Sequence, residues 1–130
     1  MYSLLDLLLV ALSMPATTYG YGEKMCGMIG KPIACVSGLP TSTGEKFNTK
    51  FITGALPVPK GFRFKSFIIY VKTYRNECIP IRINDKSNHR WVGKRGIDLS
   101  PAAVLAITGK IDKNWSGRLS FCLHTFSDIL

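Results

Sequence analysis

The sequence predicts a mainly β fold, a small closed barrel with one or two short helices. Runs rich in β-branched and aromatic residues, of which 67–71 is the clearest, alternate with turns that contain glycine and proline. Short strands are therefore expected to follow one another along the chain. One stretch, 100–109, carries both a start signal and a stop signal for a helix. The 130 residues suffice for one domain with a buried core.

Residues 1–20 read as an N-terminal segment in front of a domain that covers 21–130. The apolar run 7–12 is similar to that of a signal peptide, and Ala16 or Gly20 suits the position before a cleavage site. No basic residue precedes this run and an acidic one interrupts it, which favours the alternative of a segment that docks in an assembly. The run is too short for a transmembrane helix, so no transmembrane span is expected. We expect an exported protein, periplasmic or extracellular, and the alternative is a component of a phage virion tail.

The beginning of the domain, 21–38, is rich in glycine and is predicted to form a strand with turns. It holds two of four cysteines, an even number that suits two disulfides in an exported protein, with three possible pairings. The alternative is four buried thiols in a reducing compartment. No C-x-x-C pair or usual zinc-ligand spacing is present, so no metal or other cofactor is expected. The disulfide candidates are Cys26, Cys35, Cys78 and Cys122.

Three later segments are predicted to be strands. The apolar run 67–71 is typical of a buried strand. In 79–83, isoleucines at alternate positions share one face, and in 118–123 apolar residues alternate with the other positions. Segment 51–61 contains three turn-forming residues, and 74–77 reads as a tight polar turn. Many short strands with regular turns suit the barrel.

The start signal of the predicted helix at 100–109 lies two residues after the acidic residue Asp98. Ser100 is placed to cap the helix, Pro101 suits its first position, and Gly109 suits the residue past its end. Asp85 follows the 79–83 isoleucines, and a polar, cationic loop separates it from Asp98. This unit of strand, loop, acid and helix is expected to bring two carboxylates close to one cationic loop.

The formal net charge of +9 favours an anionic partner. Nucleic acid, anionic lipid and anionic cell-wall polymer all qualify on charge alone. The basic residues are dispersed, and no pattern of a nucleic-acid-binding motif accompanies them. We therefore expect no specific nucleic acid among the partners.

Several segments together carry a resemblance to a known family. Residues 83–85 read Ile-Asn-Asp, and 96–103 read Gly-Ile-Asp-Leu-Ser-Pro-Ala-Ala. Upstream, 41–48 read Thr-Ser-Thr-Gly-Glu-Lys-Phe-Asn, and a Leu-Pro pair at 56–57 has a glycine nearby. These segments resemble the signature of the rare lipoprotein A (RlpA) family and the first domain of bacterial expansins. The resemblance covers roughly residues 22–123 and implies a six-stranded double-psi β-barrel.

The activity implied by this resemblance is that of a peptidoglycan lytic transglycosylase. In related barrel enzymes that cut glycans, the aspartate matching Asp98 is the general acid, a role that requires a carboxyl that stays protonated near neutral pH. Asp85 would be the partner carboxylate, which positions substrate or tunes Asp98. The alternatives are that Asp98 helps to cap the helix and that Asp85 is a turn residue. The expected partner is the peptidoglycan glycan strand or another anionic wall polymer.

Four further residues are candidates for binding substrate. Glu45 matches a family position, and His89, Trp91 and Arg95 lie in the cationic loop. The alternative for Glu45 and His89 is a side chain that only faces water, and the alternative for Trp91 is covering the barrel end instead of stacking on a sugar. The loop before Asp98 is longer than the family's, which permits a non-catalytic, expansin-like wall-binding module. A structural component of a phage tail or baseplate, in contact with neighbouring virion proteins, is the other alternative.

Overall fold

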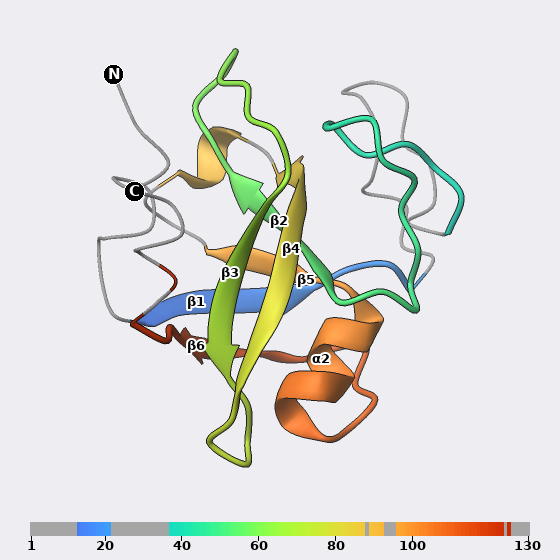
Figure 1. Ribbon diagram of the computed structural model, residues 1–130. Coiled ribbons are helices and arrows are strands. Elements are labelled where there is room, and N and C mark those ends of the chain that lie inside the picture. The colour runs from blue at the N-terminus through green and yellow to red at the C-terminus, as the bar shows by residue number, and fades with distance from the viewer. Residues whose placement is uncertain (1–12, 22–36, 88, 93–95, 124, 126–130) are drawn as a thin grey trace.

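The computed structural model describes residues 13–21, 37–87, 89–92, 96–123 and 125 (Figure 1). Its described elements are strands, one α-helix and one 3-10 helix. In chain order they are β1 (Ser13–Thr18), β2 (Thr53–Pro57), β3 (Phe67–Lys72), β4 (Cys78–Ser87), η1 (His89–Trp91), β5 (Ile97–Leu99), α2 (Pro101–Thr108) and β6 (Ser116–Ser120).

The strands form one six-stranded sheet in the order β3-β4-β2-β5-β1-β6. Two pairs are parallel, β1 with β5 and β2 with β4, and the other neighbours run antiparallel. The sheet curls into a half-barrel (Figure 1). Its edge strands approach each other, because Phe121, directly after β6, makes an antiparallel bridge with Val71 of β3. The predicted fold class, mainly β with a small barrel and one or two short helices, is confirmed.

Contacts from the end of the chain cross the opening between these edge strands. A disulfide joins Cys78, the first residue of β4, to Cys122 after β6. The backbone N–H of Cys122 donates to the carbonyl of Tyr70 in β3 at 2.9 Å, and the Thr125 hydroxyl bonds the N–H and carbonyl of Tyr70 at 2.7 Å each. The disulfide prediction is confirmed for this pair, whereas Cys26 and Cys35 lie outside the described residues.

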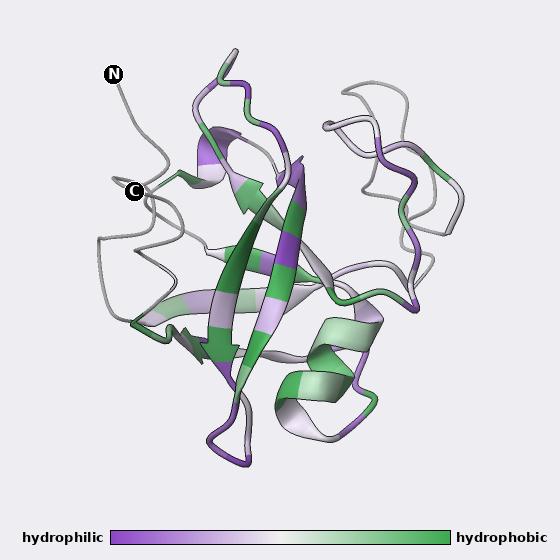
Figure 2. Cartoon of the chain, in the orientation of Figure 1, coloured by the Kyte–Doolittle hydropathy of each residue, from purple (hydrophilic) through white to green (hydrophobic). Residues whose placement is uncertain are grey.

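The core fills the concave side of the sheet with aliphatic side chains from each described strand and from α2. In β4, Ile81 and Ile83 are fully buried while Pro80 and Arg82 are exposed, as the alternation predicts. Figure 2 shows this alternation in the colours of β4 and the more uniformly hydrophobic β3 beside it. Full burial of one such aliphatic side chain contributes roughly 1.5–3 kcal/mol, so the core is the main source of stability.

The predicted helix is present with its predicted ends. The Ser100 hydroxyl accepts from the N–H of Ala103 at 3.2 Å, and Pro101 occupies the first helical position. Gly109 adopts φ 77°, and its N–H donates to the carbonyl of Leu105 at 2.8 Å. A left-handed residue at this point closes the last turn, which glycine does without a steric penalty.

Strand β1 lies inside the range 1–20 that the sequence assigns to an N-terminal segment. It pairs with β5 on one side and with β6 on the other, and Ala16 is buried in the core. The sheet therefore begins no later than Ser13, and a cut after Ala16 or Gly20 would remove most or all of an interior strand. Apolar composition is common to signal peptides and buried strands, so only the strand pairing separates the two readings.

Two other segments differ from expectation. Segment 51–61, which is rich in turn formers, contains β2, whose residues are all buried between β4 and β5. Pro57 is tolerated because it ends the strand. Strand β6 ends at Ser120, but the alternation predicted over 118–123 holds through the buried Phe121 and is lost at Cys122, which is buried, and Leu123, which is 81% exposed. It breaks because Cys122 turns inward to form the disulfide.

Candidate active site

The strand register places two carboxylates on one line across the sheet. Ala55 of β2 pairs with Asp98 of β5 on one side and with Asp85 of β4 on the other. Directly paired residues present their side chains on the same face of a sheet. Asp85 and Asp98 therefore lie on one face, separated by two strand spacings, about 10 Å between Cα atoms. We call the line Asp85, Ala55, Asp98 and Thr17 the carboxylate row.

A bulge in β4 is what puts Asp85 into this row. Gly54 pairs with Ile83, but the next residue, Ala55, pairs with Asp85 and skips Asn84. Without this extra residue Ala55 would face Asn84, and Asp85 would point to the opposite face, because side chains alternate along a strand. The bulge thus turns Asp85 toward Asp98. Asp85 was expected after the end of the strand, but β4 continues through Ser87.

Asp98 is held by its strand and by a neighbour from β1. Ile97 and Leu99 on either side are fully buried, which fixes β5, while Asp98 itself is half-buried on the other face. Thr17 pairs with Asp98 in the parallel β1–β5 register, and its hydroxyl donates a short hydrogen bond to Asp98 Oδ1. The helix cap that was an alternative role for Asp98 is made by Ser100.

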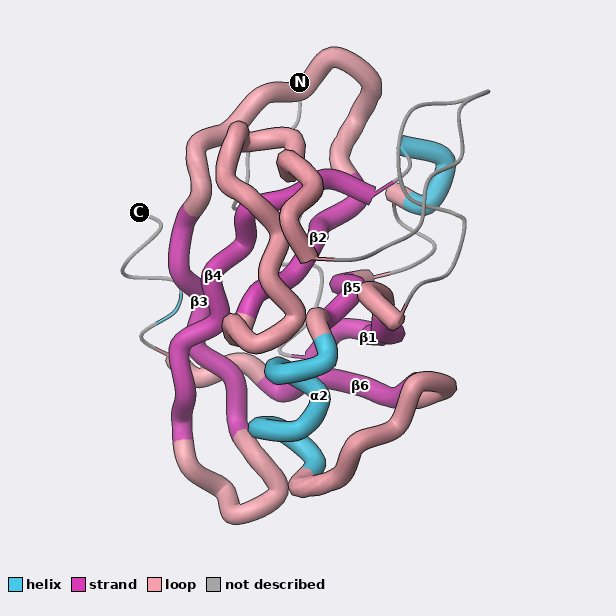
Figure 3. Tube along the Cα trace, turned by 90° about the vertical axis from the view of Figure 1, so that its right-hand side faces the viewer, coloured by secondary structure: helices cyan, strands magenta, loops and turns pink. Residues whose placement is uncertain are grey.

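Asp85 is held by two backbone donors. Its Oδ1 accepts from the N–H of Ser42 at 3.0 Å and from the N–H of Lys86 at 2.9 Å. Burial raises the pKa of the Asp85 carboxyl, and the hydrogen bonds and the Lys86 charge oppose this only in part. Figure 3 views the molecule from the side on which Figure 1 draws segment 37–52, and Ser42 of this segment makes the contact with Asp85.

Glu45 has a different environment on the same segment. Arg82 of β4 binds its carboxylate through Nε and Nη2, Ser66 donates to it at 2.9 Å, and the Asn84 amide donates at 3.0 Å. The hydrogen bonds from Arg82 contribute most to lowering the pKa of Glu45 to about 2. These contacts fasten segment 41–48 to β4 and to the residue before β3, and the suggested role of Glu45 in binding substrate stays a prediction.

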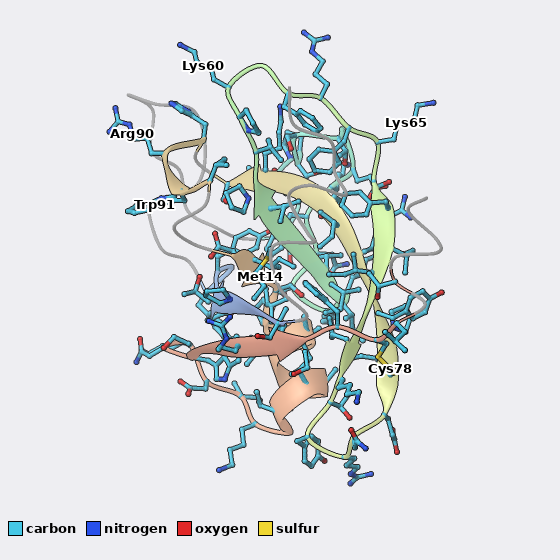
Figure 4. All side chains as sticks on the ribbon, turned by 90° about the vertical axis from the view of Figure 1, so that its left-hand side faces the viewer. Met14, Lys60, Lys65, Cys78, Arg90 and Trp91 are labelled. Atoms are coloured by element: carbon cyan, nitrogen blue, oxygen red, sulfur yellow. A yellow bond between two sulfur atoms is a disulfide. The ribbon has the colours of Figure 1, made fainter. Side chains whose placement is uncertain are left out.

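The other predicted site residues lie outside the carboxylate row. His89 and Trp91 are half-buried in η1, which follows the end of β4. Figure 4 shows Arg90 and Trp91 extending outward from this turn. Arg95 is outside the described residues. The structure therefore brings Asp85 and Asp98 into one row, whereas the suggested roles of His89 and Trp91 in binding sugar stay predictions.

Sequence reasoning missed Thr17, Ala55 and Ser42 as parts of the site. Thr17 was assigned to the N-terminal segment, and Ala55 to a stretch of turn formers. A signal for Ser42 was present, because it belongs to the 41–48 segment that carries part of the resemblance. For Thr17 and Ala55 the only signal is strand register, which is a property of the folded sheet.

Neither a scan against protein-family models nor a search of curated proteins finds a match to this chain. Among the residues that the structure describes, no group of three or more His, Cys, Asp or Glu side chains is arranged to hold a metal ion. Within the same residues, none of the helices has the length and apolar character needed to cross a membrane.

Proposed function

We propose that this protein cleaves peptidoglycan glycan strands as a lytic transglycosylase of RlpA type, with Asp98 as its general acid. The observation that carries the proposal is the carboxylate row, in which Ala55 pairs with both Asp85 and Asp98. Ala55 itself is buried, whereas Asp85 and Asp98 are both half-buried, so a glycan would meet the two acids at the partly exposed parts of their side chains. The resemblance of 83–85 and 96–103 to the family signature independently points to the same two aspartates.

The chemistry needs one transferable proton. Protonated Asp98 gives its proton to the glycosidic oxygen as the C1–O bond breaks, and an oxocarbenium-like centre forms. The C6 hydroxyl of the same sugar attacks C1 and forms the anhydro ring. The proton of that hydroxyl returns to the Asp98 carboxylate, so the acid is regenerated and no water is consumed. Asp85 binds and positions the sugar, as the resemblance implies for the partner carboxylate, and does not transfer the proton.

A binding module without catalysis is the alternative, and one observation favours it. Both carboxylates already accept hydrogen bonds from the protein, Asp98 from Thr17 and Asp85 from two backbone N–H groups. Carboxylates fixed in this way are suited to accept hydrogen bonds from sugar hydroxyls as in an expansin-like module. A phage structural protein with the same wall-binding face belongs to this alternative.

The test is the digestion of purified sacculi, with the products examined for anhydro-muropeptides. Wild type should release them, and Asp98→Asn should lower the rate on the order of 10²–10⁴-fold, because the amide cannot supply the proton. Asp85→Asn should lower it less. Equal rates for wild type and Asp98→Asn would refute the catalytic assignment. Sacculus binding without product release would replace the enzyme by the binding module. Melting temperatures of all three proteins control for folding.

A further inference from the structure

A surface cleft of about 580 Å³ opens beside Asp85. Three separate parts of the chain form it: segment 41–48, the connection from β2 to β3, and the end of β4. Hydroxyl and cationic side chains dominate its lining, together with one aromatic ring. The lining residues are Ser42, Thr43, Arg63, Phe64, Lys65, Ser66 and Lys86. We call it the cationic cleft.

The cationic cleft keeps an excess of positive charge. Arg63, Lys65 and Lys86 line it. Glu45, which accepts a hydrogen bond from Ser66, has its charge paired with Arg82. Lys86 Nζ donates to the carbonyl of Phe62 at 2.9 Å, which holds this ammonium group in place while leaving two of its donors for a ligand.

The walls of the cleft are fastened rather than loose. Ser66, on the β2–β3 connection, donates to Glu45 at 2.9 Å and accepts from Arg82 Nη2 at 2.6 Å. Thr43 donates to the carbonyl of Asn84 at 2.8 Å. The two walls are thereby tied to β4 and to each other, and Lys86 is held by Phe62, whereas Arg63 and Lys65 are exposed.

The cleft adjoins the carboxylate row at Asp85. Ser42 lines the cleft, and its N–H binds Asp85. Lys86 lines the cleft and follows Asp85 directly in β4. A polymer that contacts Asp85 therefore lies next to Lys86 and Ser42 of the cleft.

We propose that the cationic cleft binds an oxyanion group carried by the glycan that occupies the carboxylate row. This inference rests on the proposed function for the identity of the glycan. Carboxylates of peptide stems and phosphates of attached wall polymers share this chemistry. Arg63 can bind either in a two-pronged manner, and the ammonium groups add charge.

The test is a calorimetric titration of the full chain with three probes. The first is a muramyl dipeptide with free carboxylates, the second is the same compound with its carboxylates amidated, and the third is a glycerol phosphate oligomer. At least one charged probe should bind and weaken as salt rises, because exposed charges are screened beyond about 8 Å at physiological ionic strength. The neutral probe should bind at least several-fold more weakly. Carboxylate and phosphate sources are distinguished by which charged probe binds.

Matched charge variants locate the site. Arg63→Ala combined with Lys65→Ala should weaken the charged probe on the order of tenfold, as expected for two partly exposed ion pairs. Lys60→Ala combined with Lys110→Ala removes the same charge outside the cleft lining and should change affinity less than about threefold. All four substituted side chains are exposed, and Figure 4 shows Lys60 and Lys65 extending outward from the β2–β3 connection, so both double variants should disturb packing little.

Three results would overturn the inference: no binding of either charged probe, equal binding of the neutral probe, or equal effects of the two double variants. These outcomes are separate from those of sacculus digestion. Probe binding at the cleft without sacculus cleavage would leave the site standing and remove the enzyme. Sacculus cleavage by a protein that binds no charged probe would do the reverse.

Discussion

Glu45 and Asp85 lie on opposite sides of the same contact, Glu45 on segment 41–48 and Asp85 on β4. The pKa values of their carboxyl groups nevertheless shift in opposite directions from the ordinary values. Glu45 accepts from a guanidinium, a hydroxyl and an amide, and the pKa of Glu45 falls to about 2. Asp85 accepts from two backbone N–H groups, and burial raises the pKa of Asp85.

The difference follows from the charge of the donors. A guanidinium brings a full positive charge and a two-pronged hydrogen bond to Glu45, which outweighs the loss of hydration. Two backbone amides bring only partial charges to Asp85, and these do not compensate for its burial. The Arg82 hydrogen bonds make Glu45 a tie between segment 41–48 and β4, whereas the donors around Asp85 and the Lys86 charge leave its pKa raised. The carboxylate row depends on strand pairing. The contacts of Glu45 with Arg82, Ser66 and Asn84, which we call the Glu45 ties, depend on side-chain hydrogen bonds.

The largest effect should come from removing residues 1–20, because this deletes β1 and leaves the Glu45 ties intact. β1 lies between β5 and β6, so its loss unpairs both strands and takes Thr17 from Asp98. We expect no cooperative thermal transition in this truncated chain. Circular dichroism melts of the truncated and full chains would test it. A cooperative melt of the chain that starts at Tyr21 would show that the barrel does not need β1.

The disulfide lies outside both the carboxylate row and the contacts of Glu45. Its removal should lower the stability of the protein without changing the pKa of Glu45 or of Asp85. Its cysteines are 44 residues apart, and the chain-entropy model gives about 4 kcal/mol for a loop of that size. Cys78→Ser combined with Cys122→Ser should lower the free energy of unfolding by up to this amount, as measured by urea titration. The NMR titrations of Glu45 and Asp85 should stay as in wild type. A shifted titration of either carboxyl would mean that the barrel closure and the two regions are coupled.

Arg82→Gln should make the environment of Glu45 more like that of Asp85, because it removes the guanidinium that binds the Glu45 carboxylate. Without the guanidinium, the pKa of Glu45 should rise from about 2 toward its ordinary value of 4.5. The expected loss of stability is about 1 kcal/mol or less, because this ion pair is partly exposed. Carboxyl NMR titration of wild type and variant would measure the change. Lys72→Gln, at an exposed β3 position, is the control and should leave Glu45 unaffected.

The smallest expected effect is on the pH dependence of stability. The pKa of Glu45 is lower folded than unfolded, so Glu45 contributes stability above about pH 4.5 that is lost as the pH falls toward 2. The pKa of Asp85 is higher folded than unfolded, so its contribution grows as the pH falls through its raised pKa. The two carboxyls therefore oppose each other in acid.

Asp85→Asn removes the contribution of Asp85, which increases stability as the pH falls, and leaves that of Glu45. Urea melts between pH 2 and pH 7 should show a steeper acid loss of stability in Asp85→Asn than in wild type, and a shallower one in Arg82→Gln. Identical acid slopes for wild type and Asp85→Asn would show that burial does not raise the pKa of Asp85.

Much of the fold was readable from neighbouring residues in the sequence. The α2 helix has the ends predicted from Ser100, Pro101 and Gly109, because capping depends on residues a few positions apart. The faces of β4 follow from the alternation of its isoleucines, because the side-chain period of a strand is local. The even number of cysteines indicated disulfides, and Cys78–Cys122 is one of them.

The tertiary structure alone decided which strands are neighbours and in which register. The sequence of β1 is as consistent with an N-terminal leader as with a strand, and β2 is hidden among turn formers. The site depends on both, because Ala55 aligns the two aspartates and Thr17 binds one of them. The skipped Asn84 in β4 turns Asp85 to the same face as Asp98. Pairing and bulges are settled by packing between residues far apart in the chain, so local sequence carries no direct signal of them.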